Sequence, residues 1–243
     1  GEARRVPGRA GRSGVLVVEL DSASPELKQQ AVRLTQRLGT YQPPDHLSAH
    51  LSKETEALLA PALARIGLPR QNVEPLRPWL LAMMITVVEL QRAGYDPEYG
   101  IDRLLLGWAR NRKRVVALET VEEQLGTFAG LPDAQQERFL QATLREASGA
   151  GEQVVQLFAA WRAGDTAAIE SAAFKESGDP VYAPVYEALL YARNVAMAEK
   201  IGAVVTSSES HVAVGAAHLV GPRGILALLR QKGFTVRQVP HGG

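Results

Sequence analysis

Two short apolar runs that end in a glutamate stand out along the chain. Residues 15–20 are apolar except for Glu19, and the apolar residues 115–118 are followed directly by Glu119. Continuous apolar runs of this length are typical of strands that are buried on both faces of a sheet. We therefore predict strands over residues 15–20 and 115–119, with a third over 213–217 and a fourth over 234–239.

Helical periods fill most of the remaining chain. Ser24, Pro25 and Glu26 supply a capping hydroxyl, a proline for the first turn and a carboxylate that the helix dipole favours, so a helix should run from there to about residue 38. Between residues 120 and 190 the pattern is helical without a persuasive strand. Other helices are predicted near residues 52–66, 78–94, 100–109, 182–201 and 222–232.

Strands separated by helices indicate an α/β fold, here a small mixed sheet with many helices. We expect residues 1–14, which are rich in Gly and Arg, to be a flexible N-terminal arm. Residues 15–243 should form one domain, with a helical insert at about residues 120–200 between core strands.

Composition narrows the class of protein. The chain is 46% hydrophobic and has 27 Lys and Arg against 26 Asp and Glu, so we expect a packed core and no nucleic-acid partner. Cysteine is absent, which excludes thiolate metal sites and a cysteine nucleophile. The longest apolar run, residues 78–88, is shorter than the roughly 18 to 20 residues that a membrane-spanning helix needs.

Glu19 and Glu119 are the first candidates for chemistry. If their strands run parallel, both glutamates lie at the carboxyl edge of the sheet, where ligands of open α/β sheets bind. Two carboxylates there suit a divalent metal or an acid–base pair. The alternative is that each glutamate caps a helix or pairs with an arginine.

Three further polar residues fall in apolar or glycine-rich surroundings. His218 follows the small residues 215–217, and Gly221 allows the chain to turn after it, an arrangement that can present a metal ligand or a base. Taken alone, this motif favours a structural histidine. Arg193 and Asn194 interrupt an apolar helical stretch. An inward Arg193 would need acidic partners such as Glu19, Glu119 or Asp102, whereas the alternative is a surface arginine.

Other motifs carry less weight. His46 and His50 have the spacing of a helical metal-ligand pair, but the prolines before them favour a loop and a surface pair. The glycines at 221 and 224 match no phosphate-loop pattern, so we do not expect an anion site there.

Several of these motifs together resemble those of the TraB/GumN/PrgY family, which is related to the Tiki proteases. Their order and spacing match over about residues 15–239, nearly the whole chain. The residues that carry the resemblance are 17–21, 76–79, Gly100 to Asp102 with Leu105 and Ala109, 118–124, Tyr191 to Asn194, and Val214 to Gly221.

The resemblance implies an α/β fold similar to the erythromycin-esterase and haem-binding ChaN group. It also implies a metal-dependent peptidase that uses two G-x-x-H motifs and a glutamate. Gly215 to His218 matches the second motif. The first is missing, because only 14 residues precede Val15 and none is a histidine. We therefore expect one ligand and one strand to be absent, through a truncated start or through loss of the site.

Site roles follow from the same resemblance. His218 with Glu19 or Glu119 would hold Mn²⁺, Co²⁺ or Zn²⁺, and the other glutamate would be the general base. Arg193 would stabilise the oxyanion, with Asn194 and Asp102 orienting it. Gly215 and Gly221 would support the loop that carries the histidine.

Two alternatives to hydrolysis stay open. Members of the family are associated with shutting down peptide pheromone signalling, which predicts peptide binding without turnover. The likeness to ChaN predicts haem or small-ligand binding, with His211 or His218 as the axial ligand. The resemblance is compatible with a periplasmic, secreted or membrane-associated location, the last through segments outside this sequence. A missing strand would leave a sheet edge that predicts a homodimer.

Overall fold

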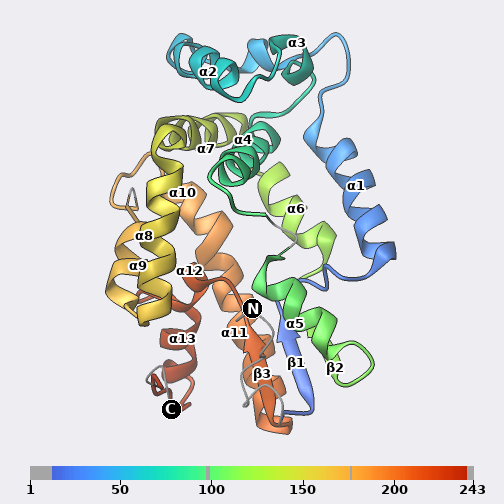
Figure 1. Cartoon of the computed structure of the whole chain (residues 1–243), viewed down its shortest axis with the longest axis vertical. Helices are drawn as coiled ribbons and strands as arrows, with labels where there is room; N and C mark the ends of the chain where they lie inside the picture. The colour runs from blue at the N-terminus through green and yellow to red at the C-terminus, as the bar shows by residue number, and fades with distance from the viewer. Residues whose placement is uncertain (1–12, 97–98, 176, 240–243) are drawn as a thin grey trace.

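A three-stranded parallel sheet forms the base of the fold. The computed structural model describes residues 13–96, 99–175 and 177–239 (Figure 1). The strands are β1 (Val15–Val18), β2 (Arg114–Ala117) and β3 (Ser210–Ala213), in the order β2-β1-β3. Both pairs are parallel, so the carboxyl ends of all three strands meet at one edge. Glu19 and Glu119 directly follow this edge, where the Glu119 amide donates a 2.9 Å hydrogen bond to the Glu19 carbonyl.

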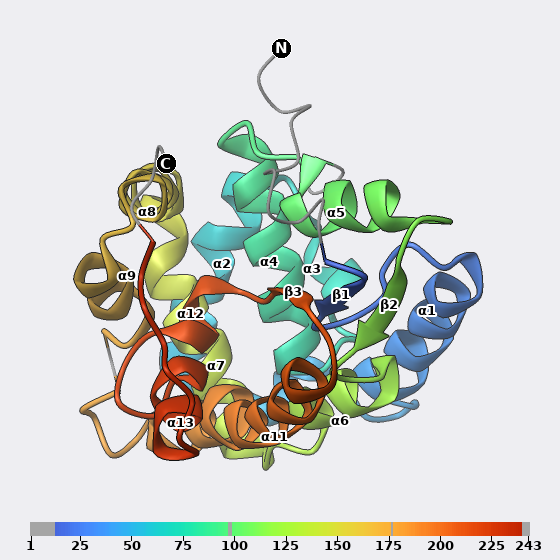
Figure 2. The same cartoon turned by 90° about the horizontal axis from the view of Figure 1, so that it is seen from below.

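Helices cover both faces of the sheet, which explains why β1 is apolar throughout. Val15 and Val17 pack on one face against α11 (Ala192–Ser207) and α13 (Ile225–Gln231). Leu16 and Val18 pack on the other face against α5 (Ile101–Ala109). Figure 2 shows the strands between α5 and α11.

The remaining helices form a second part of the core beyond the carboxyl edge (Figure 1). α4 (Pro78–Arg92) lies at its centre and contacts α1 (Pro25–Gly39), α2 (Lys53–Ile66) and α7 (Asp133–Glu146). Two predicted helix starts are confirmed, because the Ser24 and Ser52 hydroxyls accept backbone hydrogen bonds at the first turns of α1 and α2. The other helices are η2 (Leu47–His50), α3 (Arg70–Val73), α6 (Val121–Ala129), η4 (Ala147–Gly149), α8 (Ala150–Ala163), α9 (Thr166–Ala173), α10 (Ala183–Tyr186) and α12 (Ala216–Leu219).

The helix predicted over 182–201 contains a feature that its pattern does not reveal. It is observed as α10, a π-helical turn η5 (Glu187–Tyr191) and α11 in direct succession. A π turn holds an extra residue relative to an α turn, and such turns are frequent at functional sites. Helices α6 to α11 stand between β2 and β3, where the helical insert was expected.

The predicted α/β class with a small sheet and many helices is confirmed, but two strand predictions are wrong. The third strand ends at Ala213, because residues 216–219 form the short helix α12 instead. No strand forms over 234–239. Phe234 and Val236 are partly buried against the α11–α13 core without joining the sheet, so these two apolar side chains pack on helices.

Two other expectations concern the ends and edges of the fold. Of the expected arm, only Ser13 and Gly14 belong to the described residues; Ser13 is buried, and the Gly14 carbonyl accepts from the Arg114 amide. The outer strands are β2 and β3, so the predicted homodimer contact concerns those edges.

Within the described ranges, none of the helices has the length and apolar character needed to cross a bilayer.

Candidate functional site

A buried arginine joins the two glutamates at the carboxyl edge of the sheet. Arg193, in the first turn of α11, donates from Nε to Glu119 Oε1 at 2.8 Å and from Nη2 to Glu119 Oε2 at 2.6 Å. Its Nη2 also lies 3.6 Å from Glu19 Oε2, and its Nη1 donates to the Leu189 carbonyl at 2.9 Å. Burial alone would lower the pKa of Arg193, but the hydrogen bonds and charges of the glutamates raise it above its ordinary value. Arg193 is therefore a fixed cation between two carboxylates.

His218 is held in one orientation by a side chain of α11. Its Nδ1 lies 2.6 Å from Asn194 Oδ1, while Asn194 Nδ2 donates to the Arg223 carbonyl at 2.9 Å. Because the Asn194 nitrogen is committed to a carbonyl, its oxygen must be the acceptor for the imidazole. His218 therefore carries its proton on Nδ1 and presents the lone pair of Nε2.

The free nitrogen of His218 faces a carboxylate. His218 Nε2 lies 3.9 Å from Glu19 Oε2, and Glu19 Oε1 accepts a hydrogen bond from the Gly215 amide. Burial lowers the pKa of His218; the charge of Glu19 opposes this effect and that of Arg193 adds to it. With His218 neutral, two electron-pair donors face each other, an arrangement that is relieved by a cation or by a molecule that donates hydrogen bonds to both.

Gly215 is needed for this close approach. A Cβ atom at this position would lie 3.1 Å from Glu19 Oε1 and 3.6 Å from His218 Cδ2. A larger residue here would require the Glu19 carboxylate to move by a few tenths of an ångström. Gly215 is the N-cap of the short helix α12, where the sequence predicted the end of a strand.

Asp102, in the first turn of α5, carries a carboxyl group that is a weaker acid than usual. Burial and the nearby negative charge of Glu19 both raise the pKa of Asp102. A carboxyl group that keeps its proton to higher pH is a candidate general acid or base.

The fit to a divalent metal rests on two donors. His218 Nε2 and a Glu19 oxygen are a nitrogen and a carboxylate donor, which suit Mn²⁺, Co²⁺ or Zn²⁺. Both oxygens of Glu119 accept from Arg193. Within the described part of the chain, His, Asp and Glu side chains form no group of three that could hold a metal ion.

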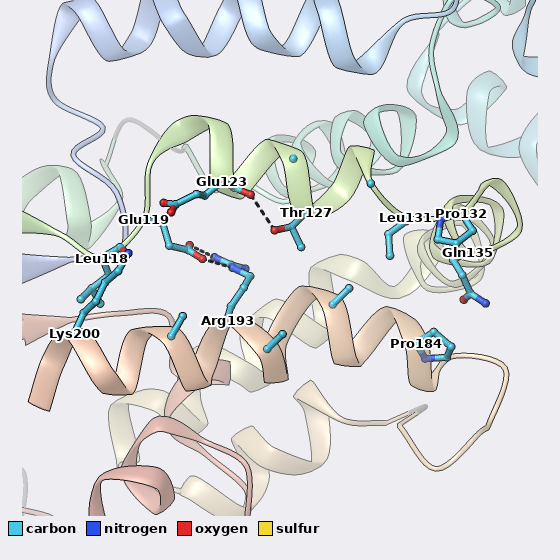
Figure 3. A pocket seen from close by; sticks show the side chains of 15 residues that line it. Leu118, Glu119, Glu123, Thr127, Leu131, Pro132, Gln135, Pro184, Arg193 and Lys200 are labelled. Atoms are coloured by element: carbon cyan, nitrogen blue, oxygen red, sulfur yellow. Dashed lines mark hydrogen bonds and ion pairs between the residues drawn. The ribbon is translucent and has the colours of Figure 1, made fainter. Parts of the chain in front are cut away.

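A groove of about 910 Å³ runs along one side of this cluster between α6 and the π turn with α11. Figure 3 shows Arg193 reaching from α11 to Glu119, which comes from the loop before α6, so that the ion pair lines the groove. Gly126, Ala188 and Ala192 are among the small residues that leave this space open. We call this space the groove.

The structure brings together six of the residues named from the sequence, and we call Glu19, Glu119, Arg193, Asn194 and His218 the polar cluster. Gly215 contacts it as described. Asn194 was expected to orient Arg193, but its side-chain oxygen forms a hydrogen bond with His218. Sequence reasoning missed the Leu189 and Arg223 carbonyls, since backbone atoms leave no signal in residue type.

The other residues named from the sequence lie apart from these contacts. Gly221 has φ of +82°, and a Cβ atom there would lie 3.3 Å from Phe174, so it serves the turn after α12. His46 Nδ1 lies 3.1 Å from the Pro44 carbonyl, whereas His50 Nε2 lies 2.7 Å from Asp45, so the two imidazoles have separate partners. His211, on β3, has a pKa lowered by burial and by the charge of Lys113.

A small parallel sheet is enclosed by helices; Glu19 and Glu119 directly follow β1 and β2, and the other members of the polar cluster lie on α11 and α12. This arrangement defines an α/β protein that places its candidate site at the carboxyl edge. The chain belongs to the TraB/PrgY/gumN family, whose model matches residues 5–238. The family predicted from the sequence motifs is thereby confirmed.

The names of the similar curated proteins state no activity. The chain is 30% identical over 165 residues to the uncharacterized protein YbaP of Escherichia coli K12, an alignment that covers 65% of this chain and 58% of the relative. The YbaP protein of Shigella flexneri matches with the same figures. The chain thus spans less than two thirds of these relatives. No solved structure matches the chain significantly.

Proposed function

We propose that the polar cluster is the active site of a metal-dependent hydrolase that acts on peptides. The observation that carries the proposal is the neutral His218 nitrogen facing Glu19 across 3.9 Å, with the other imidazole nitrogen fixed by Asn194. Histidines that ligate metals usually have their second nitrogen held in this way, because the partner sets the tautomer and the ring orientation.

His218 and Glu19 would hold the ion. A divalent ion bound there would supply Lewis acidity toward a carbonyl oxygen and would lower the pKa of an attacking water. Glu19 also accepts from the Gly215 amide, which keeps its second oxygen directed at His218. The family resemblance is the reason to choose a peptide as substrate.

The other members of the cluster would prepare the site electrostatically. Arg193 is anchored by both oxygens of Glu119, so its charge stays next to Glu19 without reorganising during a reaction. Glu119 thus serves as the anchor of Arg193 in this proposal. Asp102, with its raised pKa, would exchange protons with the leaving amine or the water.

A titration with matched variants tests this proposal. Mn²⁺, Co²⁺ and Zn²⁺ are titrated into the chain by calorimetry, and hydrolysis of quenched fluorescent peptides is followed with and without a chelator. We expect one ion per chain and chelator-sensitive hydrolysis, both lost in His218→Ala and Glu19→Gln. His211→Ala is the control, because it removes a half-buried histidine from β3 outside the polar cluster.

The alternatives give different results. Peptide binding that is insensitive to the chelator and to Glu19→Gln would replace hydrolysis by sequestration. A Soret band on haem titration that disappears in His218→Ala or His211→Ala would favour a haem-binding protein. Loss of hydrolysis in His211→Ala together with normal hydrolysis in His218→Ala would contradict the proposed site.

A further inference from the structure

A second cavity adjoins the polar cluster on the side of the helical insert. Its volume is about 370 Å³, within the range of about 300–1,000 Å³ that is typical of ligand pockets. Its wall is formed by α6, α7, α9, α10, the π turn and Arg193. We call it the apolar cavity, because most of its large uncharged side chains are aliphatic or aromatic: Phe128, Phe139, Tyr182, Val185, Tyr186, Leu189 and Leu190.

The charges on this wall have opposite partners. Glu146 and Lys175 lie 3.8 Å apart, with side chains 40% and 63% exposed, so they form an ion pair at the solvent side. Arg193 is neutralised by Glu119 and Glu19. Among the described residues, each charged side chain on the wall therefore has an oppositely charged partner, so none is available to pair with a charged ligand. A neutral apolar group would instead be stabilised by transfer out of water.

Aromatic rings favour a particular shape of apolar group. Trp79 stacks on Phe128 with ring centroids 5.9 Å apart, and Phe128 contacts Phe139 at 5.8 Å. These distances lie in the range of about 4.5–7 Å at which aromatic rings attract each other. Because Phe128 and Phe139 also line the cavity, a ring bound there would extend the row.

The apolar cavity and the polar cluster share a wall. Arg193 lines the cavity, its Nη2 lies 3.6 Å from Glu19 Oε2, and its Nη1 donates to the carbonyl of Leu189, another wall residue. Arg193 therefore both lines the cavity and lies beside Glu19. That arrangement suits neighbouring parts of a single ligand.

We infer that the apolar cavity is a subsite that receives one aromatic or large aliphatic side chain of a peptide, next to the bond that Glu19 and His218 act on. This inference rests on the proposed function for the bond, but binding of the side chain does not require hydrolysis. An aromatic side chain should bind at least about 10-fold more tightly than alanine, because it transfers far more apolar surface from water.

Binding is tested on the full chain with N-acetyl-phenylalanine amide, N-acetyl-alanine amide and N-acetyl-aspartate amide as probes. Shifts of the methyl NMR signals of Val185, Leu189 and Leu190 report on the cavity. Two variants, Ala142→Leu and Ala173→Leu, each add volume to its wall. The matched control is Ala188→Leu, which lies on the same π turn but lines the groove.

The phenylalanine probe should shift the three methyl signals and bind at least about 10-fold more weakly to both filled variants, with Ala188→Leu unchanged. Two filled variants are used so that one poorly folded protein does not decide the result. Equal binding of all three probes, or undiminished binding to both folded variants, would overturn the subsite.

Hydrolysis separates the subsite from the proposed function. Cleavage products of a peptide mixture, identified by mass spectrometry, should carry a large apolar residue beside the cut in the unmodified chain. Cleavage without side-chain preference would remove the subsite and leave the hydrolase. Methyl shifts with no cleavage at any metal concentration would leave the subsite and remove the hydrolase.

Discussion

The Asn194 side-chain oxygen lies 2.6 Å from Nδ1 of His218, and the Asn194 nitrogen donates to the Arg223 carbonyl. One amide group therefore connects His218, on α12, with the backbone that follows this helix. Turning this amide over would place like groups against each other at both ends. The tautomer of His218 is therefore set by a residue that itself has one allowed orientation.

Asn194→Ala should weaken the ion site while leaving its two donors in place. The variant removes the group that fixes the tautomer of His218, and we expect Mn²⁺ affinity to fall by roughly 10- to 100-fold in calorimetric titration. It also leaves two partly buried polar groups without partners, at a cost of about 1–3 kcal/mol in the free energy of unfolding.

Asn72→Ala is a suitable control for this experiment, because Asn72 is exposed on α3. Its Mn²⁺ affinity should match that of the unmodified chain. Unchanged affinity in a folded Asn194→Ala protein would show that the tautomer has no part in ion binding.

The lowered pKa of His218 makes part of the stability depend on pH. The unfolded chain, with a histidine pKa near 6.5, binds this proton more tightly than the folded chain. The contribution of His218 to stability is therefore present above that value and is lost as the pH falls through the lowered pKa of the folded state. His218→Gln should flatten the fall in urea-unfolding free energy as the pH drops below about 7.

Two other groups must be separated from this effect. His211 also has a lowered pKa, so His211→Gln should flatten the profile independently. The raised pKa of Asp102 acts with the opposite sign, since protonation of this carboxyl favours the folded state as the pH falls. Parallel profiles for His218→Gln and the unmodified chain would mean that His218 titrates as it does in the unfolded state.

The Arg193–Glu119 ion pair should be far more important for stability than a second pair of similar geometry. Its side chains are only 11% and 9% exposed, so Glu119→Gln leaves a poorly compensated buried cation and should cost about 3–5 kcal/mol. Arg223 and Glu187 are also joined by two hydrogen bonds, at 2.7 and 2.8 Å, but their side chains are 50% and 52% exposed.

Glu187→Gln is thus the matched control, with an expected cost of about 0–1 kcal/mol. Both variants are compared by urea unfolding at one pH and ionic strength. Equal losses of free energy in the two variants would contradict the importance of burial at the Arg193 pair.

Gly215→Ala tests whether metal binding depends on the close contact between Gly215, at the start of α12, and Glu19. The added methyl group would lie 3.1 Å from Glu19 Oε1, so the carboxylate must move or the amide must withdraw. We expect weaker Mn²⁺ binding with a small loss of stability. Gly107→Ala, at an exposed position of α5 with no neighbour within 4 Å of the new atom, should instead stabilise the chain by about 0.5–1 kcal/mol.

The sequence allowed the convergence of the site to be predicted better than its contacts. Apolar runs that end in Glu19 and Glu119 indicate buried strands, and parallel pairing then requires both glutamates at one edge, as observed. Helix starts at Ser24 and Ser52 are local features and were predicted correctly. The prediction of a strand over residues 234–239 was wrong. Alternate apolar side chains indicate that one side of a segment is covered, and helices can cover it as well as a sheet can.

The role of Asn194 shows a different limit of sequence reasoning. Its residue type and its place in an apolar helix mark it as unusual, but its partner depends on how α11 and α12 pack. The π turn has no residue signature in residues 187–191 either, since it depends on an extra residue being accommodated between two regular helices.

A change in the length of this π turn would alter the wall of the apolar cavity more than the polar cluster. Deleting one residue within 187–191 would restore an ordinary helix and rotate α10 by about 100° relative to α11. Val185 and Tyr186 would then leave the apolar cavity, whereas Arg193 and Asn194, on the far side of the turn, would keep their contacts with Glu119, His218 and the Arg223 carbonyl. Relatives that differ by a single insertion or deletion here are therefore expected to conserve the polar cluster and to diverge in the side chains they accept.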